Sequence, residues 1–170
     1  MKQIYTHKNG NQLLLLNEDN RNHVPAKRVN IVSVKLVRES SILYDRRSIR
    51  SPQDAYELLK GFLEDKDREH FIVVNLDTKN QPVSINICHI GSLNASIVSP
   101  REVMKSAILS SAASIMVAHN HPSGETTPSR EDVDVTKRLV EAGKLMGIEL
   151  LDHLIIGDGK FTSLKEKGYI

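Results

Sequence analysis

The stretch SIMVAHNHPSGETTPSRED, residues 114–132, joins an apolar run to a polar loop and then to the start of a helix. The run SIMVA is short and apolar, which predicts a buried strand. Ser129 is followed three residues later by Asp132, which is a capping pattern. It predicts a helix that begins at about Arg130. The strand would deliver His119 and His121 into the loop, and Asp132 would lie in the first helical turn.

These three polar side chains can meet at one ion. His119 and His121 are two residues apart, so both imidazoles point to the same side of an extended chain. The PSGETTPS loop is long enough to bring Asp132 back toward them as a third ligand. Two neutral imidazoles and one carboxylate leave a tetrahedral zinc ion with an open position for water, as in catalytic sites. The alternative is a polar loop in which Ser129 only caps the helix.

The rest of the chain alternates helices with strands. Three helices are predicted, each after a serine cap. The first follows Ser51-Pro52, and the second follows the capping box Ser99-Pro100-Arg101-Glu102 and runs through about Ser111. The third follows Ser129 and ends near Gly143 to Gly147. The other predicted strands are HFIVVNLD (70–77), its hairpin partner PVSINICHI (82–90) and IELLDHLIIG (148–157). This order predicts an α/β (α+β) fold in three layers, with a central mixed sheet.

The first 50 residues differ in charge from the rest of the chain. They carry ten Lys and Arg against four Asp and Glu, a formal +6, whereas residues 51–170 carry −4. Alternation in NIVSVKLVRES, residues 30–40, predicts a strand. We therefore expect a basic extension over residues 1–50 with one or two strands, and one domain over residues 51–170. Such an extension is a solvated segment, or it contacts nucleic acid, an acidic partner or a second copy of the chain.

Composition excludes several classes of protein. The 170 residues include no apolar run long enough to span a membrane, so no membrane partner is expected. The N-terminus lacks a signal-peptide pattern, and we expect a cytoplasmic protein. Cys88 is the only cysteine, which excludes an internal disulfide and a multi-cysteine zinc site. A zinc deaminase is disfavoured for the same reason, because it needs a Cys-x-x-Cys pair.

A hydrolytic zinc site also needs a general base. Spacing alone does not distinguish Glu69, at the head of HFIVVNLD, from Glu102, Glu125 or Glu131. The base therefore stays open at this point.

Together, the motifs resemble a known family. The order of Glu69, His119-x-His121-Pro and Ser129-x-x-Asp132 resembles the JAMM motif of JAB1/MPN metalloprotease domains. The segments HNHPSG, TPSRED, GSLNAS, SPREV and LLDHLIIG resemble the RadC-like branch more closely, over roughly residues 51–170. This resemblance implies the JAB1/MPN three-layer fold, a mixed sheet flanked by helices in a cytidine deaminase-like architecture.

Two features depart from the family's pattern. Asn120 stands where the eukaryotic deubiquitinating members have Ser or Thr. Residues 1–50 have no counterpart of the helix-hairpin-helix segment that precedes this domain in longer RadC proteins. A DNA role attributed to that segment is therefore not implied for this chain.

The resemblance implies a metallopeptidase that cleaves an amide or isopeptide bond in a protein or peptide-like substrate. His119, His121 and Asp132 would hold the zinc ion. Glu69 would accept a proton from the water and pass it to the leaving amine. Ser129 would donate a hydrogen bond to the oxyanion.

Two other functions are alternatives. RadC-like proteins carry a DNA-repair label, so metal-dependent nucleic-acid processing or binding is the second hypothesis. The third is a non-catalytic binding module, since some MPN domains have lost their metal ligands; here all five motif residues are present. His89 and His153 are secondary candidates for the site, expected mainly as structural residues of strands.

Overall fold

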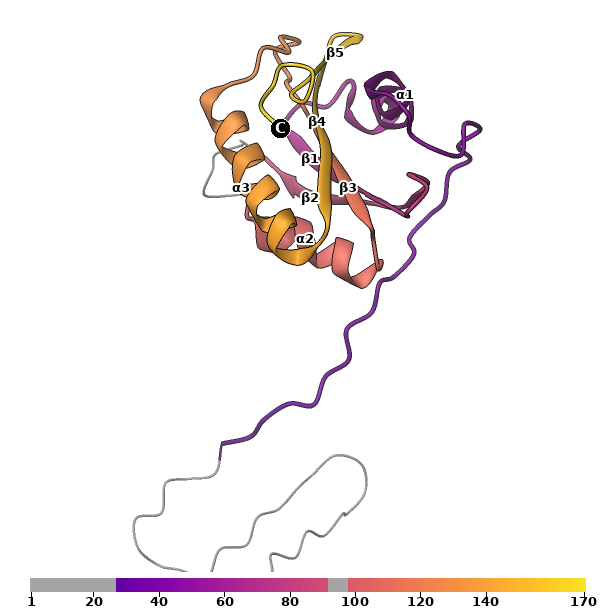
Figure 1. The fold of residues 1–170 in the computed structure, drawn as a ribbon, viewed down its shortest axis with the longest axis vertical. Coiled ribbons are helices and arrows are strands. Elements are labelled where there is room, and N and C mark those ends of the chain that lie inside the picture. The colour runs from indigo at the N-terminus through magenta and orange to yellow at the C-terminus, as the bar shows by residue number, and fades with distance from the viewer. Residues whose placement is uncertain (1–26, 92–97) are drawn as a thin grey trace, which may run out of the picture. The chain divides into compact units, whose positions relative to one another are not determined.

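The computed structural model describes residues 27–91 and 98–170. The chain divides into two compact units, Met1–Val34 and Lys35–Ile170. The second unit contains every described helix and strand, arranged as three helices around one five-stranded sheet (Figure 1). The predicted α/β fold with a mixed central sheet is confirmed.

Three serines start the three helices, as predicted. The helices are α1 (Pro52–Leu63), α2 (Pro100–Leu109) and α3 (Arg130–Met146). The hydroxyls of Ser51, Ser99 and Ser129 each accept a backbone N–H from the first turn, which satisfies a donor that the helix leaves unpaired. The capping box predicted for α2 is wrong in both halves, because the Ser99 hydroxyl accepts the N–H of Arg101 instead of that of Glu102, and the Glu102 carboxylate accepts a hydrogen bond from Lys105 at 2.6 Å.

The strands form one mixed sheet in the order β2-β1-β3-β4-β5. Their bounds are β1 (His70–Leu76), β2 (Pro82–Ile90), β3 (Ser114–Asn120), β4 (Glu149–Gly157) and β5 (Lys160–Ser163). Only β3 and β4 pair in parallel, and α3 connects them; the other neighbours are antiparallel. The four-residue β5 was not predicted as a strand, since it follows the turn at the end of the chain's last long apolar run.

Helices cover both faces of the sheet, which makes three layers (Figure 1). Successive side chains of a strand point to opposite faces, and β1 shows this directly. Ile72 and Val74 pack with α1, whereas Phe71 and Val73 pack with α2 and α3. Strand β3 lies between β1 and β4, so all seven of its residues are buried. A metal site at its end therefore rests on the most buried strand of the sheet.

The strand expected over residues 30–40 is wrong. Residues 27–50 contain neither helix nor strand, and the large apolar side chains of the run are exposed, Val32 by 75% and Val34 by 68%. Alternation shows that a segment suits a sheet, but a strand also needs a neighbour to bond with. Among the described residues the strands are β1 to β5, and this run is not one of them.

Two other predictions concern the GSLNAS loop and the absence of a membrane-spanning helix. Most of the GSLNAS loop lies outside the described residues, which resume at Val98. Within residues 27–91 and 98–170, none of the helices has the length and apolar character that a membrane crossing requires.

Candidate metal centre

The predicted histidines lie where β3 passes into the loop before α3. His119 is the penultimate residue of β3 and is fully buried. The chain stays against the sheet for one residue beyond the end of β3, because the His121 N–H donates to the Ile156 carbonyl of β4 at 2.9 Å. The parallel β3–α3–β4 connection then brings Asp132, in the first turn of α3, back over the same end of the sheet.

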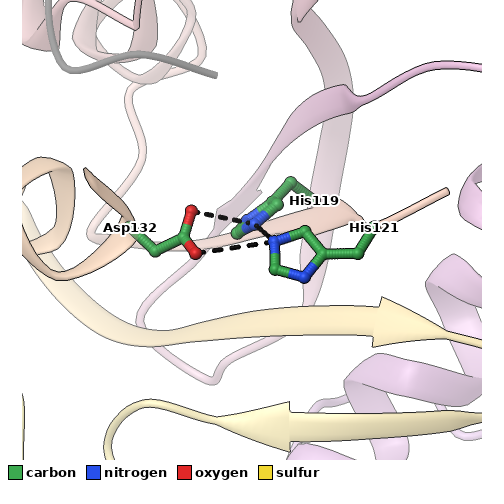
Figure 2. Close-up of side chains that lie close together, drawn as sticks. All are labelled: His119, His121 and Asp132. Carbon is green, nitrogen blue, oxygen red and sulfur yellow. Dashed lines mark hydrogen bonds and ion pairs between the residues drawn. The ribbon is translucent and has the colours of Figure 1, made fainter. Parts of the chain in front are cut away.

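Three side chains converge there (Figure 2). The Nε2 atoms of His119 and His121 are 3.0 Å apart. Asp132 places Oδ1 at 3.1 Å from the first Nε2 and Oδ2 at 3.5 Å from the second. The group His119, His121 and Asp132 predicted from spacing is thus brought together.

Asp132 is held by the helix that carries it. Its Oδ2 accepts hydrogen bonds from the Ser129 N–H at 2.8 Å and the Ser129 hydroxyl at 2.7 Å, and its own N–H donates back to the Ser129 oxygen at 3.1 Å. This is a reciprocal capping box. Because the box leaves Oδ1 turned toward His119, the same contacts that start α3 also orient the carboxylate.

Each histidine has a second ring contact that orients it. His121 Nδ1 lies 2.6 Å from the Glu125 carbonyl oxygen, and a carbonyl only accepts, so Nδ1 carries the proton. His119 Nδ1 lies 2.8 Å from Nε2 of His153, a residue of β4. His153 Nδ1 lies 2.6 Å from the Thr136 hydroxyl of α3.

Electrostatics separates the two histidines. Complete burial lowers the pKa of His119, although the nearby Asp132 acts in the opposite direction. The hydrogen bond with Asp132 raises the pKa of His121, which is less buried. Burial alone would raise the pKa of Asp132, but the two neighbouring histidines outweigh it and hold this pKa far below its usual range.

Glu69 reaches the same site from a different strand. It directly precedes β1, and it lines a cavity of about 400 Å³ together with His121, Ser129 and Asp132. Its negative charge also acts to raise the pKa values of His119 and His121. All five predicted site residues therefore gather at one end of the sheet.

Asn120, the last residue of β3, holds the segment that carries Glu69 next to that strand. Its amide Nδ2 donates to the Arg68 carbonyl at 3.1 Å, and its Oδ1 accepts the His70 N–H at 2.7 Å. The two contacts grip the backbone on either side of Glu69. Asn120 is 3% exposed, and a polar residue between two histidines at a buried strand end is the sequence signal for this role.

The remaining candidates lie elsewhere or act differently. Glu102 is on α2, paired with Lys105. His89 lies on β2 opposite Phe71 and is outside the cluster. Burial raises the pKa of the Cys88 thiol to about 12, which keeps it a poor nucleophile at neutral pH.

The donor set fits a divalent metal ion. Ligand atoms at about 2.0–2.1 Å from a tetrahedral zinc ion lie about 3.3 Å from one another. The two Nε2 atoms are 3.0 Å apart and Asp132 Oδ1 lies 3.1 Å from that of His119, both close to this value, while the other carboxylate oxygen lies 3.5 Å from that of His121. With Nδ1 of His121 donating to a carbonyl, its neutral ring offers a bare Nε2 toward the others. His119, His121 and Asp132 can therefore hold a metal ion.

Comparison with known proteins gives one consistent family. The model of the RadC-like JAB domain matches residues 49–169. The UPF0758 protein of Geobacillus sp. strain WCH70 is 59% identical over 134 residues, which are 78% of this chain and 59% of that protein. The UPF0758 protein of Methanosarcina mazei is 52% identical over 132 residues, 78% of this chain and 58% of that protein.

A further relative, the UPF0758 protein of Methanococcoides burtonii, is 51% identical over 149 residues, 86% of this chain and 65% of that protein. In each of these comparisons the match spans less than two thirds of the relative's length. The family match itself covers the whole sheet, all three helices and the histidine–aspartate cluster. This chain belongs to the RadC-like JAB domain family.

Proposed function

We propose that this chain is a zinc-dependent hydrolase that cleaves an amide or isopeptide bond in a peptide-like substrate. One observation carries the proposal: two imidazoles and a carboxylate converge, and two of these three residues, His121 and Asp132, line one cavity with a second carboxylate, Glu69. The cluster supplies three ligands, which leaves a tetrahedral ion one position for water. When bound there, a zinc ion would acidify that water and polarise the substrate carbonyl.

Glu69 is the general base and then the general acid in this proposal. It accepts the proton of the attacking water and delivers it to the leaving amine nitrogen, which becomes a neutral amine. The Asn120 contacts to Arg68 and His70 keep the backbone of this segment in one place. A carboxylate held in this way spends little entropy to reach its reacting geometry.

Ser129 is the proposed donor to the oxyanion. A serine hydroxyl has one hydrogen to donate, and in the structure that hydrogen is directed to Asp132 Oδ2. The hydroxyl must therefore turn away from the carboxylate to serve the substrate, while the backbone N–H of Ser129 keeps its contact with the same oxygen. Capping and oxyanion stabilisation are compatible in this residue.

The cavities around the site suit an extended substrate. A second cavity, of about 240 Å³, adjoins the first, and both are lined by His121, Pro122 and Ser123. The second cavity continues past the end of α1 to the turn between β4 and β5. A chain laid across both would pass its scissile bond beside His121, which supports a peptide-like substrate over a small compact one.

The direct experiment is hydrolysis by the zinc-loaded chain of a panel of peptide and isopeptide-linked substrates, with products identified by mass spectrometry. Glu69→Gln should keep the metal and lower the rate about 10²–10⁴-fold, the usual contribution of general acid–base catalysis. Glu102→Gln is the matched control, because this exposed α2 residue pairs with Lys105. Its rate should equal that of the parent.

Full activity in Glu69→Gln would remove this residue from the mechanism. The same preparation should be incubated with single- and double-stranded DNA. DNA cleavage with peptide and isopeptide bonds left intact would favour the nucleic-acid alternative. Zinc binding without hydrolysis of either class would favour the binding module.

A further inference from the structure

A chain of hydrogen bonds lies behind His119, on the side away from the cavity, and the reaction proposed above does not use it. It runs from His119 Nδ1 to His153 Nε2 (2.8 Å), from His153 Nδ1 to the Thr136 hydroxyl (2.6 Å), and from that hydroxyl to the Asp132 carbonyl oxygen (2.6 Å). Its members come from β3, β4 and α3. Since Asp132 also faces His119 through Oδ1, the contacts close into a ring.

The proton positions along this chain follow from what each group can donate. The Asp132 carbonyl only accepts, so the single hydroxyl hydrogen of Thr136 is directed to it. The Thr136 oxygen must then accept from His153, which places a proton on His153 Nδ1. A neutral His153 therefore has a bare Nε2, which accepts the proton of His119 Nδ1.

The opposite arrangement is disfavoured by burial. If the proton between the two rings belonged to His153, that ring would carry protons on both nitrogens and a full positive charge. His153, His119 and Thr136 are all 0% exposed, and burial disfavours the charged form of histidine. With its proton on Nδ1, His119 presents a bare Nε2 toward His121 and Asp132, as a metal ligand requires.

We propose that Thr136 and His153 are positioning residues that fix the tautomer of His119 and thereby set the zinc affinity of the site. The proposal rests on the metal-dependent function above and deepens it. Loss of the Thr136 hydroxyl would free His153 to move its proton to Nε2. His119 would then have to accept on Nδ1 and carry its own proton on Nε2, which blocks coordination.

The affinity test compares Thr136→Val with Thr136→Ser in the full chain. Zinc affinity is measured by competition with a chromophoric chelator, and the fold of each metal-free variant is checked by circular dichroism. Partners that orient metal-bound histidines typically contribute 10–100-fold in affinity, so Thr136→Val should lose about that much. Thr136→Ser keeps the hydroxyl and should stay close to the parent.

A tautomer measurement on the unmodified chain needs no variant. Long-range ¹H–¹⁵N correlation spectra of the metal-free protein should show His119 and His153 both protonated on Nδ1. A proton on Nε2 of His119 would overturn the proposal, as would equal zinc affinities for the parent and Thr136→Val.

The outcomes also separate this proposal from the function on which it rests. A parent chain that takes up no zinc would contradict both the positioning role and the zinc-dependent function. A parent that binds zinc, together with a Thr136→Val variant that binds it equally, would remove only the positioning role.

Discussion

Asp132 shows how one residue can serve both the fold and the site. Its carboxylate completes the capping box of α3 and faces both histidines. The N-terminal end of a helix favours negative charge, and the neighbouring imidazoles lower the pKa of this group further. The anionic ligand is therefore ionised at neutral pH before any metal arrives.

The different pKa shifts of the histidines predict the proton balance of zinc binding. Burial lowers the pKa of His119 and favours its neutral form, whereas Asp132 raises the pKa of His121 above its ordinary value of about 6.5 and keeps it protonated at pH 6. Zinc must displace that proton. Binding should therefore release about one proton per ion at pH 6, and affinity should fall about tenfold per pH unit below the His121 pKa.

Calorimetric titration at pH 6 in buffers with different ionisation enthalpies measures this number. Release of two protons would mean that His119 also starts protonated, and release of none would mean that His121 is neutral. Either result would contradict the assignment of charges within the cluster.

For single residues, the sequence predicts the metal ligands better than the residues that orient those ligands. His119 and His121 share a face because they are two residues apart, which is a local property. The contact of His153 with His119 was not predicted, because it depends on the parallel register in which Val117 lies opposite His153. Register between distant strands is set by packing of the whole sheet, so spacing along the chain does not reveal it.

Elements with local start signals agree with prediction. The three helices begin at the predicted serines because a cap needs only the next three residues. The strand expected over residues 30–40 fails because alternation cannot show whether a segment pairs with a neighbouring strand. The position of Glu69 beside the cavity was indicated by family resemblance and not by spacing along the chain. Only the fold brings β1 and α3 together, so spacing alone could not show it.

Gly143 gives a test of how closely α3 packs on the chain that follows it. A Cβ at this position would lie 2.4 Å from the Ile148 carbonyl oxygen, a backbone atom that cannot easily move. Gly143→Ala should therefore lower the free energy of unfolding by about 1–3 kcal/mol, the usual cost of overpacking. Denaturant titration of the metal-free chain measures this change.

Gly61→Ala is the matched control for this substitution. Gly61 also lies within a helix, but a Cβ there would meet nothing within 4 Å. Its replacement should stabilise the chain by about 0.5–1 kcal/mol, because alanine loses less backbone entropy than glycine. Equal effects of the two substitutions would show that α3 does not approach Ile148 this closely.

For the molecule as a whole, the site lies at the margin of a core that does not depend on it. One apolar cluster packs α1 on the sheet, and the other packs α2 and α3 on the opposite face. His121 lies outside both clusters, in the loop after β3, and its side chain is 15% exposed. Removal of the metal should therefore leave the secondary structure intact, unlike in small domains that fold only around zinc.

The most direct test of the account is the metal content of the chain, purified without a histidine tag and analysed by mass spectrometry. The parent should hold about one zinc ion per chain, as a three-ligand tetrahedral site predicts. His121→Ala should hold none while its circular dichroism spectrum is unchanged. His89→Ala, a histidine substitution outside the cluster, should keep the ion. A parent that neither contains zinc nor takes it up on titration, or a His121→Ala variant that keeps stoichiometric zinc, would contradict the account.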